Sequence, residues 1–280
     1  MTDHNSSASF MQRHHFLLRR LHSLAGIMPI GVFLMSHLTT NSSVVWGLVN
    51  GNHYAAGHAG AGTFQHEVNY IHSLPYLILI EVFGLWLPIA FHAVLGVYYA
   101  TTGRPNHIRY PYQDNWRYTL QRVSGYVGIL FIFYHIATLR WGWTFLIPGG
   151  TRWEAEYAAS TLATALQGGA DGLTTAGLIV STGYMIGVSL LVFHLANGLW
   201  TAAITWGLTL SATAQRRWGL VCAALGAGLM VMAWSAVIGF ATLDPGQARL
   251  AEDAVNRGHA PAAKTEPGVI TTQLSEEVRP

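Results

Sequence analysis

The sequence predicts an all-α integral membrane protein, a bundle of five transmembrane helices. Of its 280 residues, 51% are apolar and only 10% are charged, whereas roughly 25% of the residues in a soluble domain are charged. The mean hydropathy is also positive, at +0.31. A surface of this composition suits lipid better than water. The apolar residues form five long stretches with almost no charge, which argues against a soluble helical core.

Each of these stretches is long enough to cross a hydrocarbon core, which takes about 20 apolar residues in a helix. Helices are expected because every backbone polar group in lipid must be paired within its own segment. Pro29 and Pro88 are expected to kink the first two helices. The five predicted spans are 21–40, 75–101, 120–139, 178–208 and 218–242.

The positions of the arginines predict the orientation of the chain. Positively charged residues favour the cytoplasmic side, and arginines gather before the first span, between the second and third spans, and before the fifth span. We therefore expect a cytoplasmic N-terminal segment at 1–20, a five-helix transmembrane domain at 21–242 and an outer C-terminal tail at 243–280. The tail is rich in Ala, Pro, Glu and Thr and shows no apolar periodicity, so it is expected to be mobile. Because no signal-peptide cleavage site follows the N-terminal segment, the first span is expected to remain as an anchor.

Each of the first four spans carries one histidine deep within it. These histidines are His37, His92, His135 and His194. A polar side chain in lipid is costly unless it has a partner, so intramembrane histidines are candidate functional residues. For any one of them alone, an interhelical hydrogen bond is the alternative.

Depth along the helices sorts these histidines into two pairs. Spans one and three run outward, and a rise of about 1.5 Å per residue places His37 and His135 roughly 22–24 Å from the inner ends of their helices. Spans two and four run inward, which places His92 and His194 roughly 24–26 Å from the outer face. One pair therefore lies near each membrane surface. This is the geometry of two b-type haems stacked across a bilayer, because each haem iron can take an axial histidine on either face.

Small residues near the histidines would leave room for a flat macrocycle. Gly96 and Gly198 follow the second and fourth histidines by four residues, and so share their helix faces. Gly31 and Gly128 precede the first and third histidines by about two helical turns. The alternative is ordinary close packing of membrane helices through small residues.

At these residues the sequence resembles the five-helix, di-haem cytochrome b subunit of succinate dehydrogenases and fumarate reductases. The likeness covers residues 19–242 and is carried by the segments RRLHSLAGIMPIGVFLMSHL, HSLPYLILIEVFGLWLPIAFHAVLGVYYA, LQRVSG and FHLANGLWTAAITWG. The resemblance implies that His37 and His135 hold the iron of the outer haem. It also implies that His92 and His194 hold the iron of the inner haem.

The resemblance implies a function and partners as well. The chain would anchor a succinate:quinone oxidoreductase complex and would not act on succinate by itself. Electrons would pass from a flavoprotein subunit with FAD, through an iron-sulfur subunit, to two haem b groups and a quinone, expected to be menaquinone. The basic and aromatic connection at 104–122 is the expected docking surface for the soluble subunits. The expected location is the bacterial cytoplasmic membrane, with membrane lipid around the chain, its N-terminus inside, its C-terminus outside, and no nucleic-acid partner.

Polar residues at the inner ends of the spans are expected to face the inner haem. The propionates of that haem are anionic and would meet donors at the cytoplasmic surface. The alternative is that the arginines at this level only fix the topology. The residues expected on the propionate side are His22, Ser23, Gln121 and Arg122.

The quinone site is expected at the outer end, beside the outer haem. Quinone reduction consumes two protons, so a titratable group should lie within hydrogen-bond reach. Glu81 is the only carboxylate within the predicted spans, and His72 stands at the start of the second span. Imidazole titrates near neutral pH, so both residues are candidates for proton handling. Glu81 could instead only pack against a neighbouring helix.

Other classes of protein fit the sequence less well. The cytochrome b of respiratory bc complexes has two deep histidines on each of two helices, whereas no span here has two deep histidines. A metal transporter is suggested by a group of histidines in the first outer connection. A transporter core should, however, hold several carboxylates, and an optical spectrum with reduced b-haem bands would separate these hypotheses. The histidines of that connection are His53, His58, His66 and His72.

Overall fold

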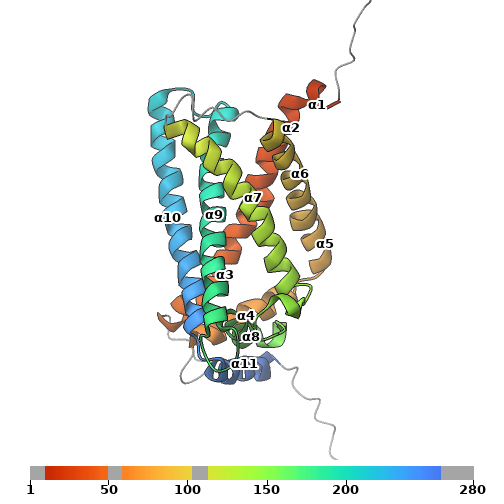
Figure 1. Cartoon of the computed structure of the whole chain (residues 1–280), viewed down its shortest axis with the longest axis vertical. Coiled ribbons are helices and arrows are strands. Elements are labelled where there is room, and N and C mark those ends of the chain that lie inside the picture. The colour runs from red at the N-terminus through yellow and green to blue at the C-terminus, as the bar shows by residue number, and fades with distance from the viewer. Residues whose placement is uncertain (1–9, 50–58, 103–112, 260–280) are drawn as a thin grey trace, which may run out of the picture.

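The computed structural model describes residues 10–49, 59–102 and 113–259, which form an upright helical bundle with a layer of helices across one end (Figure 1). Helical stretches long and apolar enough to cross a membrane number five in these residues. They are His15–Gly47, Leu77–Thr102, Trp116–Leu139, Thr175–Thr205 and Ala212–Thr242. Each overlaps one predicted span, so the prediction of an all-helical protein with five spans is confirmed.

The first two spans each join two α-helices through a π-helical turn. After α1 (Phe10–Arg13), the first span comprises α2 (His15–Ala25), η1 (Gly26–Gly31) and α3 (Val32–Val49). The second span comprises α5 (Leu77–Glu81), η2 (Val82–Trp86) and α6 (Leu87–Thr102). The other three spans lie in α7 (Gln113–Leu139), α9 (Thr175–Thr205) and α10 (Ala212–Thr242).

Proline accounts for both π-helical turns. Pro29 lies inside η1, and Pro88 follows η2 by two residues. A proline ring crowds the carbonyl of the residue four positions earlier and cannot donate a backbone hydrogen bond to it. A wider π turn accommodates that missing bond. The structure thus shows a change of helix type at each proline, while the expected kinks stay a prediction.

The connections outside the spans contain short helices that close one end of the bundle. They are α4 (Ala59–His72), η3 (Thr144–Leu146), η4 (Ala155–Tyr157), α8 (Ala158–Gln167) and α11 (Pro245–His259). Figure 1 shows α4, α8 and α11 lying across the lower end of the bundle. We call this the capped end. The opposite end carries the start of α2 and the α9–α10 connection. We call it the basic end, because many arginines gather there. They are Arg13, Arg19, Arg20, Arg117, Arg122, Arg216 and Arg217.

The prediction of a mobile tail from residue 243 is wrong for residues 245–259. These residues form α11, which packs against α4 and α8 with Ala248, Ala251 and Val255 fully buried. Their spacing of three and four residues places them on one helix face. Alanine contributes little to hydropathy, so this apolar face was missed in the sequence. Residues 260–280 lie outside the described residues.

The largest buried apolar cluster lies at the capped end rather than between the spans. It includes Phe64 of α4, Leu162 of α8 and Phe240 of α10. The spans themselves expose large apolar side chains such as Leu130 and Leu220. An apolar exterior of this kind is suited to lipid, which agrees with a multi-pass membrane protein.

Candidate functional site

The four deep histidines meet in two pairs between the spans. The ring centroids of His92 on α6 and His194 on α9 are 6.1 Å apart, and the rings are inclined at 82°. Those of His37 on α3 and His135 on α7 are 5.8 Å apart, with an angle of 86°. The structure therefore places each histidine beside the partner that its depth in the membrane suggested.

These separations suit a metal ion between the two rings of a pair. Imidazole nitrogen binds transition metals at about 2 Å, so two imidazoles on opposite sides of one ion have ring centroids about 6 Å apart. Haem iron has two such axial positions, one on each face of its macrocycle. Both histidine pairs match this spacing.

Backbone carbonyls determine which ring nitrogen is available in the His92–His194 pair. Nδ1 of His92 lies 2.9 Å from the backbone oxygen of His22, and Nδ1 of His194 lies 3.1 Å from that of Gln121. Because a carbonyl can only accept, each Nδ1 must carry the proton, which leaves each Nε2 free to bind a metal. Metal-binding histidines usually donate their other N–H to a carbonyl or carboxylate in this way.

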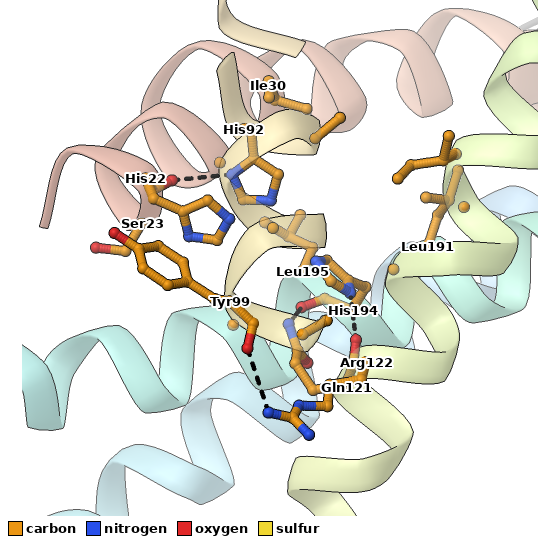
Figure 2. A pocket seen from close by; sticks show the side chains of 18 of the residues that line it. His22, Ser23, Ile30, His92, Tyr99, Gln121, Arg122, Leu191, His194 and Leu195 are labelled. Carbon is orange, nitrogen blue, oxygen red and sulfur yellow. Dashed lines mark hydrogen bonds between the residues drawn. The ribbon is translucent and has the colours of Figure 1, made fainter. Parts of the chain in front are cut away.

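A cavity of about 830 Å³ lies beside the His92–His194 pair, between α2, η1, α6, α7 and α9. Figure 2 shows the rings of His22, His92 and His194 gathered in it. Its volume falls in the range of cofactor sites. His22, Ser23, Gln121 and Arg122, the residues expected on the propionate side, all line this cavity. The glycines in its wall are Gly26, Gly31, Gly96, Gly125, Gly128 and Gly198.

Two of these glycines, which the sequence reasoning did not single out, touch the histidines. A Cβ atom on Gly26 would lie 2.5 Å from Cε1 of His92, and one on Gly125 would lie 3.2 Å from Cε1 of His194. Both imidazoles thus lie directly against a helix backbone. A glycine in the LQRVSG segment was a visible signal for Gly125, whereas only the fold brings Gly26 to the second span.

Polar atoms near the basic end of the cavity are buried without a partner among the described residues. They include Nε2 of His22 and the hydroxyl of Tyr99. The ring of His22 stacks on that of His92 with centroids 4.0 Å apart. The guanidinium of Arg19, which also lines the cavity, lies 5.5 Å from the Tyr99 ring. Since buried polar groups are normally paired, these atoms leave hydrogen-bonding capacity that a ligand in the cavity could use.

Other side chains at this level are already fixed by hydrogen bonds. Asn197 donates to Oε1 of Gln121 at 2.8 Å and accepts from Nε of Arg117 at 2.9 Å. Arg122 donates to the hydroxyl of Tyr118 at 2.6 Å. The hydrogen bonds of Asn197 thus join α7 to α9 along the wall of the cavity.

The two residues expected at the quinone lie away from this cavity. Glu81 forms an ion pair with Arg140, with Oε2 and Nη2 2.9 Å apart, and its side chain is 20% exposed. His72 is exposed at the end of α4, with its ring centroid 6.4 Å from that of Trp153. Neither residue lines the cavity.

A further carboxyl at the capped end was not singled out in the sequence. Glu67 of α4 reaches the hydroxyls of Thr40 and Ser43 on α3, and burial raises its pKa above the usual range. Its Oε2 atom is buried without a partner among the described residues. Glu67 lies outside the predicted spans, so the rule that intramembrane carboxylates are functional candidates does not apply to it.

The outer histidines proposed for a transporter do not form a metal site in the described part of the chain. His53 and His58 lie outside the described residues, and His66 and His72 are both exposed on α4. Among residues 10–49, 59–102 and 113–259, no group of three or more His, Cys, Asp or Glu side chains could hold a metal ion.

Sequence comparison provides a relative. The chain is 34% identical over 201 residues to the succinate dehydrogenase cytochrome b558 subunit of Bacillus subtilis (strain 168), and the match covers 72% of the chain and 85% of that relative. No family model matches the sequence, and no solved structure matches the chain.

Proposed function

This chain belongs to the family of succinate dehydrogenase cytochrome b subunits, and we propose that it anchors the complex in the membrane and conducts electrons to a quinone through two haem b groups. The observation that carries this proposal is the spacing of the two histidine pairs, 6.1 Å and 5.8 Å between ring centroids. His92 and His194 would hold the inner iron. His37 and His135 would hold the outer iron. A bound haem supplies reversible one-electron chemistry, with a potential tuned by its surroundings.

The protein's own groups prepare the inner site. The carbonyls of His22 and Gln121 orient the two imidazoles and keep Nε2 free. The propionates would lie toward the basic end, where charge-assisted hydrogen bonds are strong. There His22, Ser23, Gln121 and Arg122 line the cavity. Tyr99 and Arg19 join this donor group, because the Tyr99 hydroxyl is buried without another described partner.

The electron path runs from the basic end toward the capped end. A flavoprotein subunit with FAD would oxidise succinate, and an iron-sulfur subunit would bring the electrons to the basic end. Because arginines gather at the basic end, we assign this end to the cytoplasmic side of a bacterial cytoplasmic membrane. The N-terminus then lies inside and the capped end outside. The quinone, proposed to be menaquinone, would be reduced near the outer pair.

Replacement of the four histidines tests the haem assignment. In the purified complex, His92→Ala or His194→Ala should remove one haem signal and spare much of the other. His37→Ala or His135→Ala should affect the second signal. His66→Ala is the matched control, because His66 is exposed on α4. Two intact bis-histidine haems in all four variants, measured by optical and EPR spectroscopy, would disprove the assignment.

Glu81 and His72 are proposed to handle protons for the quinone at the outer end. Arg140, directly after the end of α7, holds the carboxylate of Glu81 at the capped-end side of the second span. Glu81→Gln should lower succinate-dependent quinone reduction while both haems and dye reduction by succinate stay intact. Glu67→Gln is the comparison variant. If only Glu67→Gln lost quinone turnover, the proton-handling group would be assigned to α4 instead of the second span.

A further inference from the structure

His135 of the outer pair differs from the inner histidines in what meets its second ring nitrogen. Its Nδ1 lies 3.4 Å from the hydroxyl of Tyr184 on α9. Both inner histidines meet backbone carbonyls, and Nδ1 of His194 also lies 3.1 Å from the hydroxyl of Ser124. Tyr184 is only 8% exposed, and its ring packs against that of Phe131 with centroids 5.3 Å apart. A hydroxyl can donate or accept, so the proton on each group must be decided from its neighbours.

The proposed ligation settles the direction of this hydrogen bond. With Nε2 of His135 on the iron, the proton of the neutral imidazole stays on Nδ1. The phenolic oxygen of Tyr184 then accepts from Nδ1–H of His135.

We propose that Tyr184 is a positioning residue for the outer haem, acting through His135. This inference rests on the proposed function, in which His135 would hold the iron of that haem. As the acceptor of the Nδ1 proton, Tyr184 fixes the tautomer and the orientation of the ring. It also makes the imidazole a stronger electron donor, as partners of metal-binding histidines do.

The consequence is a lower midpoint potential for the outer haem, because a more basic axial ligand stabilises the oxidised iron. Tyr184→Phe removes the acceptor oxygen and keeps the ring that packs on Phe131. We expect the potential of the outer haem to shift upward in this variant, and that of the inner haem to stay unchanged. A less constrained ring should also change the low-spin EPR signal of the same haem. The outer signal is identified by its loss in His37→Ala.

The controls separate the hydrogen bond from packing. Tyr134→Phe removes a neighbouring phenol, which donates to the backbone oxygen of Leu146 rather than to a histidine. This variant should leave both potentials in place. Tyr184→Met removes the hydroxyl together with the ring and should shift the outer potential in the same direction as Tyr184→Phe.

The outcomes decide between this inference and the function on which it rests. Unchanged potentials and EPR spectra in Tyr184→Phe, or an equal shift in Tyr134→Phe, would overturn the role of Tyr184. If Tyr184→Phe does not assemble, Tyr184→Met decides, and an unchanged potential of the outer haem in that variant rejects the inference. Absence of b-haem bands from the wild-type complex would instead reject the proposed function itself.

Discussion

A missing side chain at Gly26 determines how closely the second span can approach the first. Its Cα stands where a Cβ would come within 2.5 Å of the His92 ring. Real side chains do not tolerate such a contact, so His92 could not keep both this position and its 2.9 Å hydrogen bond to the His22 carbonyl. The shape of the cavity wall and the orientation of the His92 ring thus depend on the absence of a side chain at Gly26.

We expect Gly26→Ala to weaken or abolish haem binding by the inner pair and to spare the outer pair. The added methyl group must displace the imidazole, and overpacking of this kind costs about 1–3 kcal/mol. Haem content and the two EPR signals of the purified complex provide the measurement. Gly183→Ala on α9 is the control, because a Cβ there meets nothing within 4 Å. Two full haem signals in Gly26→Ala would contradict the close approach.

At the scale of elements, α11 holds the capped end together through one buried carboxyl. Oε1 of Glu252 accepts from the backbone N–H groups of Ala159 and Ser160 at 2.6 and 3.0 Å. Gln65 of α4 accepts from the N–H of Ala158 at 2.9 Å. The first N–H groups of a helix have no partner within it. Side chains of α11 and α4 therefore cap α8 and join three helices into one layer.

Glu252→Ala should destabilise this layer, because it leaves the N–H groups of Ala159 and Ser160 buried without a partner. Each such loss costs on the order of 1–3 kcal/mol. Glu252→Gln keeps an acceptor oxygen and should be much less harmful. Thermal unfolding in detergent, with proteolysis of the α11 segment as a local readout, compares the two variants. Equal stability of both would show that α11 packs without this cap.

Burial raises the pKa of Glu252 above its usual value of 4.5, although Ser160 and Ala159 lower it through hydrogen bonds. A carboxyl with a raised pKa in the folded state contributes stability that is complete below its unfolded pKa. This contribution is lost as the pH rises through the folded pKa. The stability of Glu252→Gln relative to the wild type should therefore increase as the pH is raised above the ordinary pKa of a glutamate. A constant difference across this range would mean that Glu252 keeps its ordinary pKa.

At the scale of the whole molecule, charge is divided between the two ends. The acidic side chains that the structure describes lie toward the capped end, while exposed arginines such as Arg216 and Arg217 lie at the basic end. Arg117, which was expected within the docking surface, is instead turned inward, where it donates to Asn197 and stacks over Trp200 at 3.8 Å. The expected docking residues Arg104 and Arg109 lie outside the described residues.

Charge reversal at Arg216 and Arg217 should release the soluble subunits at lower salt than in the wild type. Complementary charges steer and hold such contacts, and salt screens them over about 8–10 Å. Co-purification of the subunits across a salt series gives the measurement. Arg257→Glu on α11 is the matched control, since this exposed arginine lies at the opposite end. Equal release in the control would place the partners elsewhere.

The sequence alone determined the five spans, the two histidine pairs and the family. The spans follow from the hydropathy of successive residues. The histidine depths follow from counting residues along each helix at a rise of about 1.5 Å per residue. The residues expected at the propionates also line the cavity, because they stand at the same helix ends as the arginines.

Only the tertiary structure decided which surfaces meet. The approach of Gly26 to His92, the acceptor that Tyr184 offers to His135 and the cap that Glu252 gives α8 all join residues at least 49 positions apart. Glu81 was expected to face the quinone, and the structure shows its ion pair with Arg140, 59 residues away. Short-range periodicity carries no information on such contacts. They depend on how the helices rotate and pack, and that is fixed by all of their neighbours together.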